Sequence, residues 1–463
     1  MTDRLIDLDR FRNAVKGRVV GPDDETYDSD RQVLYGNFDR RPAAVVRVAD
    51  AEDVARTVAF AAEQGLEMAV RSGGHSLAGH STTEGGVVVH LGDMNRVEID
   101  VDSRTAWAQT GALAGDYTKA AARYGLATGF GDTASVGIGG ITLAGGIGFL
   151  VRKYGLTIDN VLAAEVVTAD GRIVRADPEE NPDLFWAIRG GGGNFGVVTR
   201  IQYRLVEVDD IVGGMLILPA TPETIAGFAA EASAAPEELS TIANVMKAPP
   251  LPFLPEAAHG KFALLGLMAF SGDLAVGNEV MDRFRALGEP IADMVGTIKY
   301  PGLFEEPEGG EEFHPMMEGV NLFADRFGET EAETAVSHIE ASTAAMSAVQ
   351  FRVLGGAYAR VPNDATAFGH RDRKLMVNVA AMYMDPSQRE EAAAWTRGLA
   401  DAMYPDETAG YAGFITDEGE RGARRAYPPA TLARLQEVKR RYDPDNLFHL
   451  NHNVVPLPSS KSA

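Results

Sequence analysis

The stretch that decides the fold is residues 41–81, RPAAVVRVADAEDVARTVAFAAEQGLEMAVRSGGHSLAGHS. Residues 43–48 form a short apolar run typical of a buried strand, and residues 67–72 form a second one. Between the two runs, apolar residues recur with the period of a helix. The stretch therefore predicts a strand, a helix and a second strand that ends in a glycine-rich turn.

Polar residues and glycines fix the ends of this helix. Asp50 is a typical N-cap, and Asp53 lies three residues later, where an acid completes a start resembling a capping box. Gly65 stands where a helix commonly ends in the left-handed conformation. After the second strand comes Gly73-Gly74-His75, so an imidazole leaves the strand end on a flexible turn.

Outward from this unit, the rest of the chain continues to mix strands and helices. Strands are expected at residues 86–91, 96–101, 105–111 and 196–205, helices at 115–125 and 182–189, and a hairpin at 161–176 that turns at Asp170-Gly171. Residues 207–410 have a different sequence pattern. Apolar runs typical of strands (213–219, 262–270, 374–383) lie between Ala- and Glu-rich helices (221–235, 387–403). Residues 301–333 hold ten acids and one Arg and are expected to form a solvated loop. A helix and an extended tail close the chain. The predicted class is α+β.

Composition excludes several classes of protein. The chain has 463 residues, of which 45% are hydrophobic and 24% charged, the balance of a soluble globular protein. This length predicts two or three domains, or one large composite unit. It has no Cys, so disulfides, thiolate catalysis and Cys-ligated metal centres are impossible. No secretory signal and no transmembrane run is visible, so the expected location is the cytoplasm, away from membranes.

The charge is strongly negative. The net charge of −23 repels phosphate backbones, so we expect no nucleic-acid partner. Only 9 of the 43 basic residues are Lys. This composition fits either adaptation to high salt or a GC-rich genome, and the sequence alone does not separate the two.

Three glycine-rich stretches, residues 71–81, 131–148 and 189–196, are the strongest functional signal. Glycines let the backbone approach a ligand and point N–H groups at anions, as a diphosphate cofactor requires. The alternative is that they only form tight turns. Residues 137–140 superficially resemble a dinucleotide fingerprint, but no clean strand–turn–helix surrounds them, and Asp159 is the only nearby candidate for a ribose contact. A nicotinamide site is therefore disfavoured.

Four stretches together resemble a known family. The stretch at 41–81, ASVGIGGITLAGGIGFLVRKYGLTIDNVLAAEVVTADGRIV (134–174), NPDLFWAIRGGGGNFGVVTRIQYRL (181–205) and YDPDNLFHLNHNV (442–454) are similar, in this order, to the berberine bridge enzyme-like branch of the vanillyl-alcohol oxidase superfamily. The resemblance implies a two-part FAD-binding domain, residues 1–206 and 415–463, and an antiparallel-sheet substrate domain, residues 207–414.

The resemblance also implies the cofactor residues. His75 matches the histidine that binds the 8α carbon of FAD covalently, and it would be the single attachment, because Thr133 stands where many relatives carry a second linking Cys. His80 competes with His75 but matches no family ligand. Val136 matches a position that admits oxygen. The full implied set is Arg71, Ser72, Gly73, Gly74, His75, Ser76, Leu77, Thr133, Val136, Gly137, Gly139, Gly140, Ile141, Gly145, Gly146, Gly148, Gly196, Val197, Val198, Asn451 and Asn453.

Three tyrosines are candidates for the base that takes the substrate's proton: Tyr411, Tyr383 and Tyr427. Each could instead be a core aromatic residue. Tyr411 begins Tyr411-Ala412-Gly413-Phe414, a degraded form of a family motif. His370-Arg371 resembles a family pair that could orient the substrate or cap a loop.

The implied function is oxidation of a CH–OH or CH–NH group by FAD, with O2 as the electron acceptor and a small molecule as substrate. The alternatives are a flavin dehydrogenase that uses another acceptor and a flavin-binding protein without turnover. We expect no metal, and a monomer or a homodimer.

Overall fold

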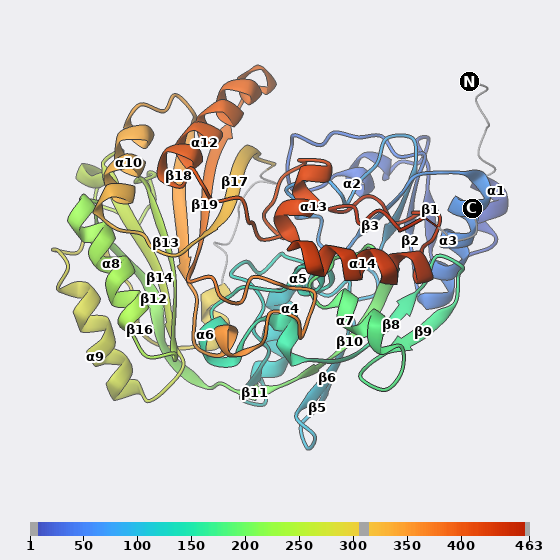
Figure 1. Cartoon of the computed structure of the whole chain (residues 1–463), viewed down its shortest axis with the longest axis horizontal. Coiled ribbons are helices and arrows are strands. Elements are labelled where there is room, and N and C mark those ends of the chain that lie inside the picture. The colour runs from blue at the N-terminus through green and yellow to red at the C-terminus, as the bar shows by residue number, and fades with distance from the viewer. Residues whose placement is uncertain (1–7, 305–313, 459–463) are drawn as a thin grey trace.

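A computed structural model describes residues 8–304 and 314–458. In the described part of the chain, the strands of the N-terminal half form sheets of four, five and two strands, and the middle of the chain forms one large sheet (Figure 1). The mixed α+β class predicted from the sequence is confirmed. Within the described part of the chain, no helix is long and apolar enough to cross a membrane.

The first sheet contains the stretch 41–81. It has the order β1 (Arg18–Val20), β2 (Ala44–Arg47), β4 (Val87–His90) and β3 (Met68–Arg71), and β4 runs parallel to both of its neighbours. The helix α3 (Ala51–Gln64) joins β2 to β3 as predicted. The Asp50 carboxylate accepts the Asp53 N–H at 3.0 Å, and Gly65 ends the helix with φ +64°.

The second sheet is antiparallel, in the order β5 (Val97–Asp100), β6 (Thr105–Gln109), β10 (Val197–Arg204), β8 (Val161–Val167) and β9 (Ile173–Ala176). The predicted hairpin is the β8–β9 pair, with Gly171 at φ +78°. Helices and short strands accompany this sheet: α4 (Ala114–Ala122), β7 (Leu126–Ala127), α5 (Ile138–Ala144), α6 (Val151–Tyr154), α7 (Pro182–Ile188) and β11 (Val206–Glu207).

The large sheet has eight strands. Its order is β15 (Ala292–Asp293), β12 (Asp210–Pro219), β14 (Phe262–Phe270), β13 (Leu239–Lys247), β18 (Met346–Val353), β19 (Leu375–Tyr383) and β17 (Met316–Ala324), and β16 (Gly296–Lys299) also pairs with β12. The helices α8 (Pro222–Ala234), α9 (Leu274–Arg285), α10 (Glu329–Glu340) and α12 (Arg389–Met403) pack against it (Figure 1). Three further short helices are α1 (Leu8–Arg12), α2 (Tyr27–Arg31) and α11 (Ala357–Arg360).

One sequence expectation about this sheet is wrong. Part of residues 301–333, expected to be a loop, is the strand β17, which pairs with β19 from Met316↔Tyr383 to Ala324↔Leu375, and α10 also begins inside this range. Within β17 only Glu318 is acidic. The other acids of residues 301–333 lie outside this strand, so their number gave no information about it. Residues 305–313 lie outside the described part.

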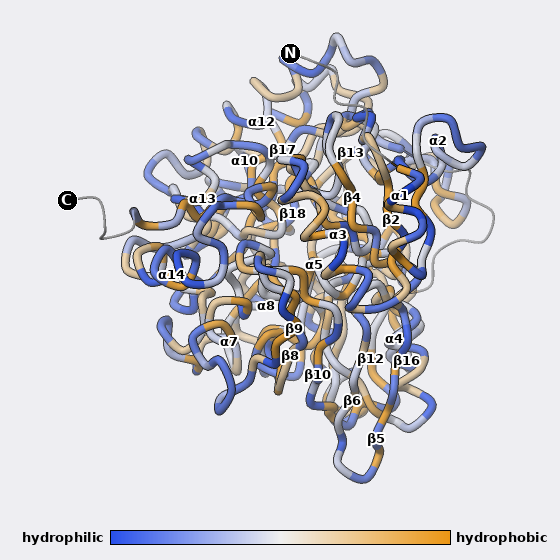
Figure 2. Tube along the Cα trace, turned by 90° about the vertical axis from the view of Figure 1, so that its right-hand side faces the viewer, coloured by the Kyte–Doolittle hydropathy of each residue, from blue (hydrophilic) through white to orange (hydrophobic). Residues whose placement is uncertain are grey.

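The C-terminal helices return to the first half of the chain. Both α13 (Glu420–Ala426) and α14 (Pro429–Tyr442) share a hydrophobic cluster with α7, β8 and β10 (Figure 1). Figure 2 shows apolar residues concentrated along the strands inside the molecule, with polar residues on the outer loops. The domain limits 1–206, 207–414 and 415–463 stay a prediction, for which this return of the chain is the physical reason.

A buried ion pair holds the C-terminal tail. The Lys439 Nζ atom donates to Asp443 Oδ2 at 2.6 Å and to the Asn194 and Phe448 carbonyl oxygens at 2.7 and 3.1 Å. Asp443 also accepts the N–H groups of Leu447 and Phe448. Both charged side chains are fully buried. The pair therefore ties α14 to the glycine-rich segment around Asn194.

Removing one charge of this pair should destabilise the protein strongly. The Asp443→Asn variant leaves a buried ammonium without its counter-charge, and we expect a loss of about 3–5 kcal/mol in the free energy of unfolding, measured by urea denaturation. The control is Glu420→Gln, which breaks the exposed Arg424–Glu420 pair of α13 and should cost less than about 1 kcal/mol. Equal effects of the two variants would show that the buried pair does not hold the tail.

Candidate active site

One cavity of about 560 Å³ is lined by the three glycine-rich stretches together with the large sheet. Its wall is formed by residues from 70–81, from 131–147 and from 192–198, by Gln350, Arg352 and Met382 of the large sheet, and by the segments 411–415 and 448–452. The cavity therefore joins parts of the chain that are hundreds of residues apart.

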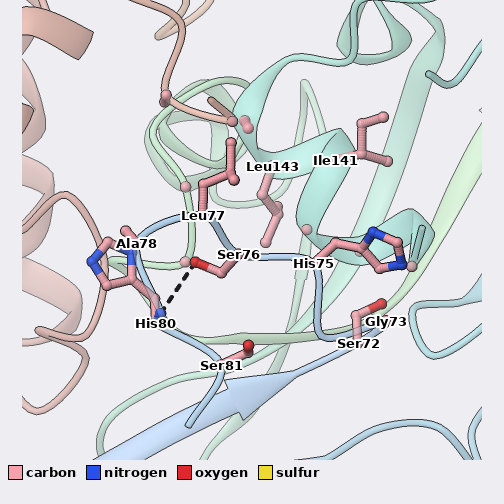
Figure 3. A pocket seen from close by; sticks show the side chains of 18 of the residues that line it. Ser72, Gly73, His75, Ser76, Leu77, Ala78, His80, Ser81, Ile141 and Leu143 are labelled. Carbon is pink, nitrogen blue, oxygen red and sulfur yellow. Dashed lines mark hydrogen bonds between the residues drawn. The ribbon is translucent and has the colours of Figure 1, made fainter. Parts of the chain in front are cut away.

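The loop after β3 carries His75 along this cavity (Figure 3). A Cβ atom on Gly73 would lie 2.3 Å from the Gly137 nitrogen, and one on Gly137 would lie 2.2 Å from the Gly73 nitrogen. The two glycine-rich loops thus touch backbone to backbone, a contact that any side chain would prevent. Gly74, at φ +75°, then turns the chain, and the next residue, His75, lines the cavity.

The same loop offers hydrogen-bond donors. Among the described residues, the backbone N–H groups of Gly73, Gly74, Ser76 and Leu77 have no acceptor. All four residues line the cavity. Successive free N–H groups in a turn form a concave site for an anion, as the diphosphate of FAD requires.

Gly140 shows that the cavity keeps space for a ligand. It lies in α5, where Gly is less favourable than Ala by about 1 kcal/mol. A Cβ atom on Gly139 would lie 2.9 Å from Thr110, which explains that glycine by packing. A Cβ atom on Gly140 would meet nothing within 4 Å. Because Gly140 also lines the cavity, this open space is available to a ligand that lies against α5. The residues present therefore fit FAD.

The C-terminal tail contacts the third glycine-rich stretch. The Gly193 N–H donates to Asn451 Oδ1 at 3.2 Å, and Asn194 Nδ2 donates to the His452 carbonyl oxygen at 3.3 Å. In return, the Val454 N–H donates to Asn194 Oδ1 at 3.0 Å. Asn194 and Lys439, which sequence analysis did not single out, therefore place Asn451 and His452 in the cavity wall.

Most of the cofactor residues expected from the sequence lie together in this wall. They are Ser72, Gly73, Gly74, His75, Ser76, Leu77, Thr133, Val136, Gly137, Gly139, Gly140, Ile141, Gly196, Val197, Val198 and Asn451. Arg71, Gly145, Gly146, Gly148 and Asn453 are not in the wall. Arg71, for example, is buried behind the loop and donates to the carbonyl oxygens of Asp30, Arg31, Gln32 and Ser81.

Two of the three candidate tyrosines line the cavity. Tyr411 is buried, and its hydroxyl oxygen accepts the Gly146 N–H at 3.0 Å. Burial raises the pKa of Tyr411 to about 12, so its phenol stays neutral at physiological pH. Burial also raises the pKa of Tyr427. Both can donate a hydrogen bond but are poor proton acceptors.

The other candidates for substrate contact lie elsewhere, which corrects the sequence expectation. Tyr383, at the end of β19, lies beside Glu391 and Trp395 at a separate small pocket. The His370 ring contacts the Ala426 carbonyl oxygen at 2.9 Å. Arg371 donates to both Asp159 oxygens at 2.7 and 2.8 Å. These contacts join structural segments, and none of the three residues reaches the cavity wall.

The cavity wall also contains a pair of charges, Asp132 and Arg352, that was not predicted from the sequence. Arg352, on β18, donates to Asp132 Oδ2 at 2.8 Å and to the Ile147 carbonyl oxygen at 3.0 Å. Gln350 accepts from the same guanidinium at 2.9 Å. Asp132 lies in the second glycine-rich stretch, four residues before Val136. Its position in that stretch is the sequence signal that could have identified it as a site residue. No sequence pattern marks Arg352.

Two further histidines face each other at the cavity. The rings of His80 and His452 lie 5.2 Å apart in a T-shaped arrangement. Burial lowers the pKa of His80 to about 3 and that of His452 to about 4. Both imidazoles are therefore neutral at physiological pH. Figure 3 shows His80 at the opposite end of the loop from His75.

The fold and the cavity define an FAD-binding oxidoreductase, and comparison with known proteins gives the family. Residues 42–177 match the FAD binding domain family model, and residues 404–455 match the berberine and berberine-like model. The chain belongs to the berberine bridge enzyme-like family of FAD-linked oxidoreductases, which confirms the resemblance seen in the sequence.

Individual relatives cover nearly the whole chain. The (R)-6-hydroxynicotine oxidase of Paenarthrobacter nicotinovorans is 31% identical, over 96% of this chain and 97% of the relative. The glucooligosaccharide oxidase of Sarocladium strictum is 27% identical, over 94% and 91%. The crystal structure of 6-hydroxy-D-nicotine oxidase from Arthrobacter nicotinovorans is 28% identical and superposes with a TM-score of 0.82, over 96% of this chain and 98% of that one.

Filling the space at Gly140 should prevent cofactor binding. We expect the Gly140→Leu variant to fold but to be purified without the flavin absorbance, because the side chain occupies the ligand space. The matched control is Gly398→Leu on α12, where a Cβ atom likewise meets nothing within 4 Å but lies outside the cavity. Circular dichroism checks the fold, and the visible spectrum measures the flavin. A fully yellow Gly140→Leu protein would contradict the placement.

Proposed function

We propose that the protein is an FAD-dependent oxidase that takes a hydride from a CH–OH or CH–NH group and passes the electrons to O2, forming hydrogen peroxide. The observation that carries the proposal is the cavity itself, in which an anion-binding loop, an open face at Gly140 and polar groups of the large sheet meet. The relatives named as oxidases of a nicotine derivative and of oligosaccharides support it.

We further propose that FAD is attached through His75 alone. His75 lies in the cavity beside the free N–H groups of its loop, and the chain contains no Cys. A glucooligosaccharide oxidase from Acremonium strictum is described with a 6-S-cysteinyl, 8α-N1-histidyl FAD. Thr133 lines the cavity but carries no thiol, which supports a single bond here.

The residues of the cavity have distinct tasks in this proposal. Bound FAD supplies the hydride acceptor. The loop after β3 holds its diphosphate, and the Tyr411 hydroxyl, oriented by the Gly146 N–H, donates a hydrogen bond to the substrate. Val136, a small apolar residue in the wall, leaves room for O2. The aromatic and aliphatic groups of Tyr35, Phe414 and Met382 exclude water from the reacting carbon.

The covalent bond can be tested without a substrate. Acid-precipitated wild-type protein should stay yellow, and a peptide that contains residue 75 should carry the flavin mass. We expect His75→Ala to release its flavin on precipitation, whereas His80→Ala keeps it, because both histidines line the cavity but only His75 is attached. Flavin retained by precipitated His75→Ala protein would overturn the attachment.

The reaction can be tested by anaerobic reduction. A panel of secondary alcohols, sugars and cyclic amines is mixed with the holoprotein, and we expect at least one class to bleach the flavin absorbance. Admission of air should restore the colour and form one hydrogen peroxide per flavin reduced. Bleaching that air does not reverse would favour a dehydrogenase with another acceptor. A flavin that dithionite bleaches but no member of the panel does would favour a protein without turnover.

A further inference from the structure

Asp132 and Arg352 are the only acid and the only Lys or Arg among the described residues that line the cavity. They come from separate parts of the fold, Asp132 from the second glycine-rich stretch and Arg352 from β18 of the large sheet. The ion pair of 2.8 Å is mostly buried, with 21% of the Asp132 side chain and 4% of the Arg352 side chain exposed. The carboxylate is therefore the more accessible partner.

The two oxygens of Asp132 are in different situations. Oδ2 is bound by Arg352. Oδ1 is contacted, among the described residues, by the adjacent Thr133 hydroxyl at 3.3 Å, a long hydrogen bond. A carboxylate oxygen can accept two hydrogen bonds. Oδ1 can therefore accept a further hydrogen bond from a donor group of a ligand.

Arg352 fixes the position of this carboxylate, because its guanidinium donates to Oδ2 at 2.8 Å. The guanidinium is itself held by Gln350, the Ile147 carbonyl oxygen and the Phe414 ring, whose centre lies 5.2 Å from it. Gln350 in turn donates to Asn244 Oδ1 at 2.9 Å. Arg352 is a positioning residue whose fixed geometry aims Asp132.

From this arrangement we propose that Asp132 is the catalytic base that accepts the proton of the substrate's hydroxyl or amine group. The inference rests on the proposed oxidase function. When a CH–XH group becomes C=X, the carbon loses a hydride to the cofactor and the heteroatom X loses a proton. That proton moves to Asp132 Oδ1 while the X–H electron pair becomes part of the C=X bond. Every atom and electron is then accounted for.

The tyrosines fit a different task. A neutral phenol such as Tyr411 must first lose its own proton before it can accept one, and burial opposes that loss. The carboxylate needs no such step. Tyr411 therefore donates a hydrogen bond to the heteroatom while Asp132 takes the proton. The need for a base is greatest for an alcohol, because a neutral amine can lose a hydride without prior loss of a proton.

The test compares Asp132→Asn with wild type in anaerobic stopped-flow reduction, using the first alcohol of the panel that bleaches the wild-type flavin. A general base contributes about 10²–10⁴-fold, so we expect the reduction rate to fall by that factor while the flavin spectrum is kept. Asp293→Asn is the matched control, because Asp293 pairs with Arg285 at 2.7 Å outside the cavity. Its reduction rate should equal that of wild type.

The pH profile separates a base from a merely structural acid. The described titratable groups whose charges reach Asp132 are Arg352, Tyr35 and Tyr411. A single protonatable base gives the wild-type reduction rate an acid limb, that is, a fall of the rate at low pH. Asp132→Asn should lose this acid limb, and Tyr411→Phe should keep it.

A second readout does not depend on turnover. The infrared difference between the wild-type and Asp132→Asn holoproteins at pH 7 should show an ionised carboxylate and no protonated carboxyl. A protonated Asp132 at pH 7, or an Asp132→Asn variant with wild-type rate and acid limb, would overturn the proposal. If no alcohol or amine bleaches the wild-type flavin although dithionite does, the oxidase function itself fails, and the base assignment fails with it.

Discussion

The site depends on the contact between the backbones of Gly73 and Gly137. One residue follows the parallel strand β3, the other precedes α5, and there is no room for a side chain on either. This contact brings the His75 loop against the helix that carries Gly140, so the N–H groups of the loop and the open space beside Gly140 border the same cavity. A side chain at either glycine would push the loop and the helix apart and open this wall of the cavity.

Two further contacts close the cavity, and both are between polar groups. Lys439, with Asp443 and Asn194, holds the C-terminal tail against the third glycine-rich stretch. Arg352 joins the large sheet to the loop of Asp132. Buried ion pairs are costly unless both partners are held by several hydrogen bonds. The Lys439–Asp443 pair meets this condition fully, whereas in the second pair only Arg352 does. Their role is to fix the relative position of segments that are distant in the sequence, so the same contacts that close the fold also place reactive groups.

Local signals in the sequence predicted much of this structure. Some signals act within a few residues of the chain, such as the N-cap Asp50, the helix-ending Gly65 and the Asp170-Gly171 turn. The glycine-rich stretches indicate that the backbone is approached closely there. What could not be predicted depends on the registers and contacts of the large sheet. Tyr383 lies on a strand that reaches the cavity through Met382, yet its own side chain lies at another pocket, because successive side chains of a strand point to opposite faces. Arg352 is likewise one basic residue of an unremarkable strand until the fold places it beside Asp132.

The most direct test of the account is a crystal structure of the yellow holoprotein. We expect electron density for FAD that is continuous with the His75 ring, that places the diphosphate against the N–H groups of the loop after β3, and that fills the space beside Gly140. Density for flavin at another place in the molecule, or flavin in this cavity bonded to a different residue, would contradict it.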